Sequence, residues 1–204
     1  MIKQIFTLAL CLTALGSMNS TNAHATATIG EVAPNFETVD TYGAALSLDQ
    51  LKGKIVVLEW TNHKCPFVAK QYESGNMQKV QASVAGEDVV WVSIVSSAPK
   101  KQGAVNTDEA NAITKSVNAT LNHKILDPSG DIGRLYDAQT TPHMFVINAD
   151  GVLAYAGAID DHTTWRQDGI DDAKNFVVAA ITDLRAGKTV ETSQTKPYGC
   201  AIKY

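Results

Sequence analysis

Hydrophobic residues fall into short runs separated by polar and helix-like segments. The runs at 55–58 and 89–95 are almost wholly apolar, which is typical of strands covered on both faces of a parallel sheet. The runs at 143–148 and 152–157 flank Ala149-Asp150-Gly151, and this arrangement predicts a β-hairpin. Shorter strand-like runs lie at 46–48 and 125–127.

Apolar positions spaced three or four residues apart predict helices between these runs. The clearest pattern covers 171–186 and is followed by Gly187, a residue that often ends helices. Further helices are expected at 66–85 with an interruption at Ser74-Gly75-Asn76, at 107–118 with Thr107 as N-cap, and at 132–136. This order predicts an α/β fold with a mixed central sheet and helices on both faces.

The first 25 residues differ in composition from the rest. Lys3 precedes an apolar run at 5–15, and Ala23-His24-Ala25 is an A-x-A cleavage pattern, so we predict a signal peptide over 1–25. Cys11 lies in the apolar run, but Leu10 stands where lipid attachment requires a small residue, which leaves a lipoprotein as the minor alternative. No apolar run is long enough to span a bilayer, so we expect a periplasmic protein without stable membrane insertion.

Charge and length indicate which partners and how many domains to expect. The chain has 17 Lys and Arg against 21 Asp and Glu, a net charge of −4, and no basic cluster. Nucleic acid is therefore not an expected partner. We expect one domain over 26–187 and a C-terminal tail over 188–204.

The stretch that carries chemistry runs from Trp60 to Pro66, directly after the first buried strand. A proline suits the first position of a helix, which places Cys65 at the N-cap. Free backbone N–H groups and the positive helix end favour a thiolate there, and His63 and Lys64 would add to this effect. The sequence thus predicts a reactive thiol that solvent can reach. The alternative is a small buried hydrophobe.

Cys200 is the second cysteine that follows the predicted signal peptide. An even number of cysteines in an exported protein suggests a pair that can form a disulfide. Such a pair would be either a static link between tail and domain or a reactive thiol with its resolving partner. Both interpretations remain open.

Three motifs together resemble the thioredoxin fold, and more narrowly its exported redoxin branch. This branch includes alkyl hydroperoxide reductase and thiol-specific antioxidant proteins and periplasmic thioredoxin-like reductases. The resemblance covers about 29–186 and depends on Trp60 to Pro66, on Asp127-Pro128-Ser129-Gly130, and on Thr141-Pro142 with Phe145-Val146-Ile147-Asn148. It implies a three-layer α/β fold. It also implies a cis Pro142 beside the cysteine, with the backbone of Thr141 offered to an extended thiol substrate.

The sequence departs from the family pattern in two places. Val68 stands where thioredoxin-like reductases have the second cysteine of Cys-x-x-Cys, so a local dithiol is absent. Asn62 stands where peroxiredoxins have Thr or Ser, and Thr61 is one residue too far. No arginine is near Cys65 in sequence, so an arginine-paired thiolate would need Arg134 or Arg166 to approach through the fold.

These observations predict a thiol-disulfide oxidoreductase or thiol peroxidase. It would act on peroxides or on protein or small-molecule disulfides, with an external thiol reductant and no cofactor or metal. The predicted catalytic residues are Cys65 and Cys200, supported by Trp60, Thr61, His63, Lys64, Pro66, Thr141 and Pro142. The alternative is a non-catalytic binding module with a structural Cys65–Cys200 disulfide.

A variant of this alternative binds copper through His63, Cys65 and His143. Otherwise His143 is expected to be a hydrogen-bonded surface residue. Asp160-Asp161-His162 is expected to be a solvated loop.

Overall fold

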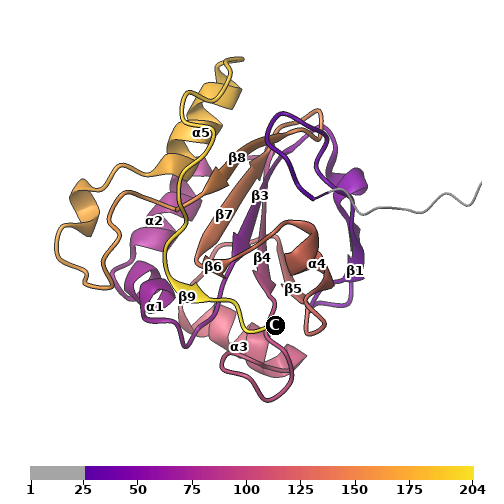
Figure 1. The fold of residues 1–204 in the computed structure, drawn as a ribbon, viewed down its shortest axis with the longest axis vertical. Helices are drawn as coiled ribbons and strands as arrows, with labels where there is room; N and C mark the ends of the chain where they lie inside the picture. The colour runs from indigo at the N-terminus through magenta and orange to yellow at the C-terminus, as the bar shows by residue number, and fades with distance from the viewer. Residues whose placement is uncertain (1–25) are drawn as a thin grey trace, which may run out of the picture.

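The computed structural model describes residues 26–204. The predicted signal peptide and Cys11 lie outside the described residues. A five-stranded sheet forms the centre, in the order β5-β4-β3-β7-β8 (Figure 1). Its strands are β3 (Ile55–Trp60), β4 (Val89–Val95), β5 (His123–Leu126), β7 (His143–Ile147) and β8 (Leu153–Gly157).

Strand directions confirm the predicted mixed sheet. β3 and β4 pair in parallel, as do β4 and β5. β7 runs antiparallel to both β3 and β8. β3 is therefore central, and all six of its residues are buried, as its apolar sequence predicts.

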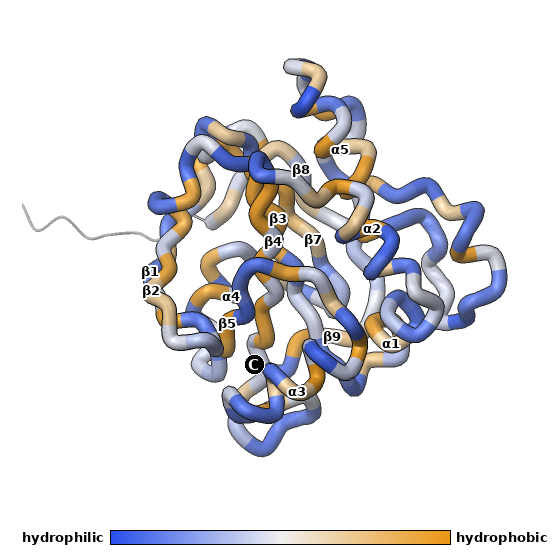
Figure 2. Tube along the Cα trace, turned by 180° about the vertical axis from the view of Figure 1, so that it is seen from behind, coloured by the Kyte–Doolittle hydropathy of each residue, from blue (hydrophilic) through white to orange (hydrophobic). Residues whose placement is uncertain are grey.

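Helical segments cover both faces of the sheet, as predicted. One face packs against α2 (Asn76–Val84) and α5 (Phe176–Arg185) through residues such as Met77 and Ile181. The other face packs against residues of α4 (Asp131–Leu135) and of the N-terminal segment. Figure 2 shows the apolar strands enclosed by more polar outer segments.

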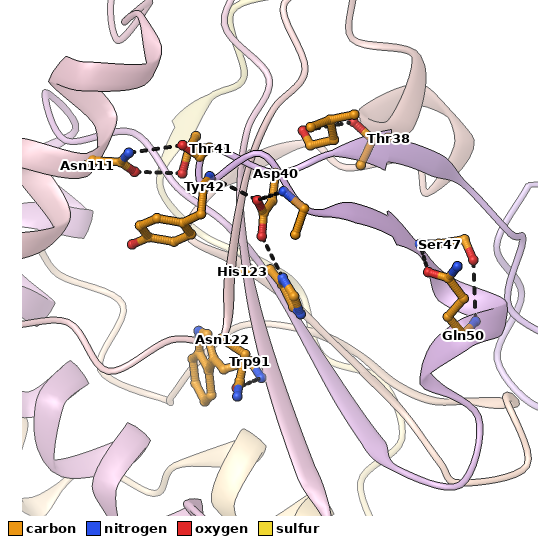
Figure 3. A network of polar contacts seen from close by, with 12 residues as sticks. Thr38, Asp40, Thr41, Tyr42, Ser47, Gln50, Trp91, Asn111, Asn122 and His123 are labelled. Atoms are coloured by element: carbon orange, nitrogen blue, oxygen red, sulfur yellow. Dashed lines mark hydrogen bonds and ion pairs between the residues drawn. The ribbon is translucent and has the colours of Figure 1, made fainter.

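The N-terminal segment forms a small hairpin of β1 (Glu37–Val39) and β2 (Ala45–Ser47), followed by the 3-10 helix η1 (Leu48–Leu51). Polar contacts attach it to the domain (Figure 3). The Asp40 carboxylate accepts hydrogen bonds from the backbone N–H groups of Tyr42 and Ala44 and lies 2.7 Å from His123 Nδ1 on β5. Thr41 donates to Asn111 at 2.6 Å.

The predicted interruption at 66–85 is confirmed, because it divides the segment into two helices, α1 (Pro66–Glu73) and α2. Two other predicted helix boundaries were wrong. Asn106, and not Thr107, caps α3 (Thr107–Ser116), because its side chain accepts from the backbone of Glu109. The last helix begins at Phe176 after the cap Asn175, while its predicted first turn is the separate 3-10 helix η2 (Ile170–Asp172).

The C-terminal tail leaves α5 and returns across the sheet. Ser193 and Thr195 exchange backbone hydrogen bonds with Ala156 of β8. The tail then forms β9 (Cys200–Ala201), which pairs with β6 (Thr140–Thr141) in a separate two-stranded sheet (Figure 1). Over residues 26–204, none of the helices has the length and apolar character needed to cross a bilayer.

Candidate functional site

Cys65 is the N-cap residue of α1, and Pro66 is the first residue of the helix. The backbone oxygen of Cys65 accepts hydrogen bonds from Val68 at 3.0 Å and Ala69 at 2.9 Å. The thiol therefore lies at the amino end of a helix, as predicted, where backbone N–H groups favour negative charge.

The Cys65 thiol contacts the segment before β7. Its Sγ atom donates to the carbonyl oxygen of Thr141 at 3.0 Å. The Thr141–Pro142 peptide bond is cis, as the resemblance implied. Two segments far apart in sequence therefore meet at this sulfur.

Cys200 completes the site from the tail. In the antiparallel pair of β6 and β9, Cys200 lies opposite Thr141. Cys65 and Cys200 are both free thiols in the structure, and they lie close enough for each side chain to affect the pKa of the other. The fold thus brings together the two cysteines that the sequence singled out.

Gly199 makes this close approach possible. Its φ is +135°, a value that favours glycine. A Cβ atom at this position would overlap the carbonyl oxygen of Thr141. The residue before Cys200 therefore has to be glycine for β9 to reach β6.

Cys65 is fully buried, which contradicts the prediction that solvent can reach it. Cys200 is partly exposed. The physical reason is that the docked tail brings Cys200 into contact with the Cys65 thiol, where an external molecule would otherwise approach. The tail was expected to supply a possible partner for Cys65, but its position over the Cys65 thiol was not predicted.

The two thiols differ in acidity. Burial acts to raise the pKa of Cys65, but hydrogen bonding from the side chains of Cys200 and Thr141 and from the Val68 backbone lowers it, and the pKa lies below its ordinary value. Burial and the contact with Cys65 raise the pKa of Cys200 to about 11. Cys65 is therefore the thiol that ionises first, and Cys200 is the one that keeps its proton.

A buried polar cluster anchors the tail just before Cys200. The hydroxyl of Tyr198 donates to Asp160 and accepts from Lys70 at 3.3 Å and Gln71 at 3.2 Å. The ring of Tyr198 also contacts Phe67. Asp160 is only 1% exposed, so the prediction of a solvated loop was wrong at this residue. The fold supplies this buried carboxyl group with hydrogen-bond donors, among them the side-chain amide of Gln71 at 2.7 Å.

The last residues anchor the other end of β9. Ile202 donates its backbone N–H to Gln139 at 3.0 Å, and the Lys203 carbonyl accepts from Ala98 at 2.8 Å. Tyr204 donates to the Ala138 carbonyl at 2.8 Å and packs under the guanidinium of Arg134. Because contacts lie on both sides of Cys200, β9 is held as a strand between β6 and the segment after β4.

Some predicted supporting residues have other partners or face solvent. Trp60 is a core residue that donates to Ser96 at 3.0 Å and packs on Tyr136 and Phe145. Lys64 is exposed. Burial, followed by the charge of Lys64, lowers the pKa of His63. The strongest effects on the Cys65 pKa come from burial and hydrogen bonds, and not from these basic side chains.

His143 is 5% exposed, so the prediction of a surface residue was wrong. Its Nδ1 accepts from the Gln139 backbone at 3.3 Å, and its ring packs on Phe145. Burial lowers its pKa to about 4. This position directly after the cis proline is in the interior because His143 opens a strand whose five residues are all buried.

His63, Cys65 and His143, the residues considered as copper ligands, are not gathered into one group. Among residues 26–204, no group of three His, Cys, Asp or Glu side chains is arranged to hold a metal ion. The two arginines considered for peroxide activation are engaged elsewhere, Arg134 with Ser129 and Tyr204, and Arg166 with Trp165.

Glu59 is a buried carboxyl group on β3 that was not predicted from the sequence. It accepts hydrogen bonds from Trp91 at 2.8 Å and from the Tyr72 hydroxyl at 2.9 Å. Burial raises the pKa of Glu59. The signal was a single acidic residue inside an otherwise apolar strand, which is rare unless the residue has partners.

A mixed five-stranded sheet with a cysteine at a helix start beside a cis proline defines a thioredoxin-like protein. The chain belongs to the Redoxin family, whose family model matches residues 28–174. No curated protein matches the sequence.

Solved structures agree with this fold. A hypothetical protein from Sinorhizobium meliloti 1021 is 25% identical with a TM-score of 0.73, over 88% of this chain and 96% of that one. An uncharacterized conserved protein from Geobacillus kaustophilus is 22% identical with a TM-score of 0.74, over 87% and 92%. A candidate thiol:disulfide interchange protein DsbE from Chlorobium tepidum is 20% identical with a TM-score of 0.54, over 76% and 99%.

Proposed function

We propose that this redoxin is a thiol-disulfide oxidoreductase in which Cys65 is the nucleophile and Cys200 resolves the intermediate. The observation that carries the proposal is the contact of two free thiols, one with a lowered and one with a raised pKa. A lowered pKa increases the thiolate fraction, and the thiolate is the attacking species. Val68 stands at the position of the second cysteine of the Cys-x-x-Cys pattern, and Cys200 takes over the role of that cysteine.

The exchange proceeds in two steps. The Cys65 thiolate attacks one sulfur of a substrate disulfide, forming a mixed disulfide and releasing the other half as a thiolate, which takes up a proton. Cys200 loses its proton and attacks the Cys65 sulfur, which forms the Cys65–Cys200 disulfide and releases the second substrate thiol. One disulfide is reduced and one is formed, and an external dithiol then reduces the protein.

The tail has two roles in this scheme. The docked tail covers Cys65, so it leaves before a substrate disulfide can reach the sulfur. It then returns with Cys200 to resolve the mixed disulfide. The same segment therefore limits access and completes the reaction.

Disulfide exchange is favoured over peroxide reduction by the surroundings of Cys65. Arg134 and Arg166 engage other residues, and Asn62 does not supply the hydroxyl that peroxiredoxins use. We propose that the activity is exported, because 1–25 has the pattern of a signal peptide and an oxidising compartment suits a cysteine pair.

Mass spectrometry of the cysteine peptides tests the proposal. Reduced protein receives a substoichiometric amount of oxidised glutathione or, separately, hydrogen peroxide. We expect a Cys65–Cys200 disulfide in the wild type, a trapped glutathione adduct on Cys65 in Cys200→Ser, and no adduct in Cys65→Ser. A wild-type disulfide that resists excess dithiol would show a static link and would contradict the proposal. Faster oxidation by peroxide than by glutathione would identify a thiol peroxidase instead.

A further inference from the structure

A cavity of about 100 Å³ lies between α1 and α3. Its walls are mainly apolar side chains, including Val68, Ala69, Val95, Ile113 and Val117. Neither Cys65 nor Cys200 lines it, so the cavity is separate from the contact between the two thiols.

One cation lines this apolar cavity. Lys124 of β5 is 6% exposed, although lysine is rarely buried without a partner. Within residues 26–204, its ammonium group donates a single long hydrogen bond, to the Ser93 hydroxyl at 3.4 Å. An ammonium group has three donors, so two of them have no acceptor in this part of the chain.

Glu59 does not accept a hydrogen bond from the Lys124 ammonium group. Strand register places Glu59, Ser93 and Lys124 in one row across β3, β4 and β5, with Ser93 between the two charges. The Glu59 oxygens accept from Tyr72 and Trp91, and no ion pair joins Glu59 to Lys124 among the described residues. Burial lowers the pKa of Lys124, and only the distant charge of Glu59 opposes this.

The outer part of the cavity has a different character. His63 is partly exposed and Glu73 is exposed, and both line the cavity. An anionic ligand group would be repelled by Glu73 but attracted by Lys124. The charges therefore favour a ligand that places an acidic group at the buried end and an apolar body between the helices.

We propose that this cavity binds a small carboxylic acid, with its carboxylate on Lys124 Nζ and its short apolar chain between α1 and α3. A charge-assisted hydrogen bond would satisfy the donors of Lys124 and supply its missing counter-charge. The cavity volume limits the length of the apolar chain of the ligand. An engineered cavity of about 150 Å³ holds the six carbon atoms of benzene, so a chain of about four carbon atoms fits here.

Titration of the full chain with pentanoate, followed by NMR of the backbone amides, tests this proposal. Pentanol and pentylamine are the matched probes, because they keep the chain and change the head group. We expect saturable pentanoate binding with shifts in α1, α3 and β5. Pentanol should bind about tenfold to hundredfold more weakly, since a hydrogen bond to a charged group contributes about 1.5–3 kcal/mol. Pentylamine should bind least.

Two variants locate the binding. Lys124→Met keeps an apolar stem and should remove the preference for pentanoate over pentanol. Ala69→Phe should fill the cavity and reduce binding of both probes. Equal binding of pentanoate and pentanol to the wild type, a preference that survives in Lys124→Met, or no saturable binding of pentanoate would each overturn the proposal. The readout is independent of the cysteines, so it does not depend on the proposed redox function.

Discussion

Cys200 lies opposite Thr141 in the β6–β9 pair, and the carbonyl oxygen of the same threonine accepts the hydrogen bond of Cys65. One residue thus aligns the two thiols. The tail occupies the backbone edge of Thr141 that the family resemblance assigned to an extended thiol substrate. A substrate that pairs with this edge therefore competes with the chain's own tail.

Gly199→Ala is expected to release the tail and expose Cys65. The added Cβ would overlap the Thr141 oxygen, and the positive φ adds strain of about 1–3 kcal/mol. Alkylation of Cys65 by iodoacetamide, followed by peptide mass spectrometry, should be about tenfold faster or more. Gly53→Ala is the matched control, because its φ is +89° but its Cβ would meet open space. An equal increase in both variants would contradict the tail as the cover.

Cys200→Ala is expected to raise the pKa of Cys65. Burial acts to raise this pKa, and the hydrogen bond from the Cys200 side chain is the strongest effect opposing it. Cys200→Ser keeps a donor and should give a smaller rise. The ultraviolet absorbance of the thiolate against pH measures both values. A Cys65 pKa that is the same in wild type and Cys200→Ala would show that the helix end alone sets the acidity.

Tyr198→Phe is expected to lower the free energy of unfolding by about 1–3 kcal/mol, because buried Asp160 loses a hydrogen-bond donor. It should also increase the alkylation rate of Cys65, since Tyr198 anchors the tail next to Cys200. Urea denaturation and the alkylation assay measure the two effects. Tyr42→Phe is the control, because Tyr42 is exposed and should change neither value.

His143 is expected to make the protein less stable in acid. Burial lowers its pKa from 6.5 to about 4, so the unfolded chain binds a proton that the folded chain does not. Stability should therefore fall as the pH drops from about 6.5 to about 4, by up to about 3 kcal/mol from this residue. His143→Asn keeps an acceptor for Gln139 and should flatten this part of the curve. Urea unfolding at several pH values would show whether the slope persists without the imidazole.

The sequence predicted the sheet, the N-cap position of Cys65 and the hairpin well, because these follow from local patterns. Three apolar runs become β3, β4 and β7, and Pro66 marks the helix start. The first turn of the last predicted helix failed because the side chain of Asn175 caps the backbone of Val178 and begins α5 later than the apolar spacing suggested.

The site was predicted only in part, because its decisive contacts are non-local. Cys65 and Cys200 could be selected by residue type, but their acidity depends on a tail that docks against β6. Buried Asp160 likewise has a hydrogen-bond donor from the tail, the hydroxyl of Tyr198. The spacing of apolar residues predicts which residues face a core. It does not predict which distant segment of the chain covers them.

The passage of the tail along β8 has a consequence for behaviour in concentrated solution. β8 is the last strand of the sheet, and Ser193 and Thr195 take up hydrogen-bonding groups of Ala156 on that strand. A free strand edge is a template for pairing with another molecule. Full detachment of the tail would therefore leave the outer edge of β8 unpaired. Self-association through this edge would then compete with substrate binding.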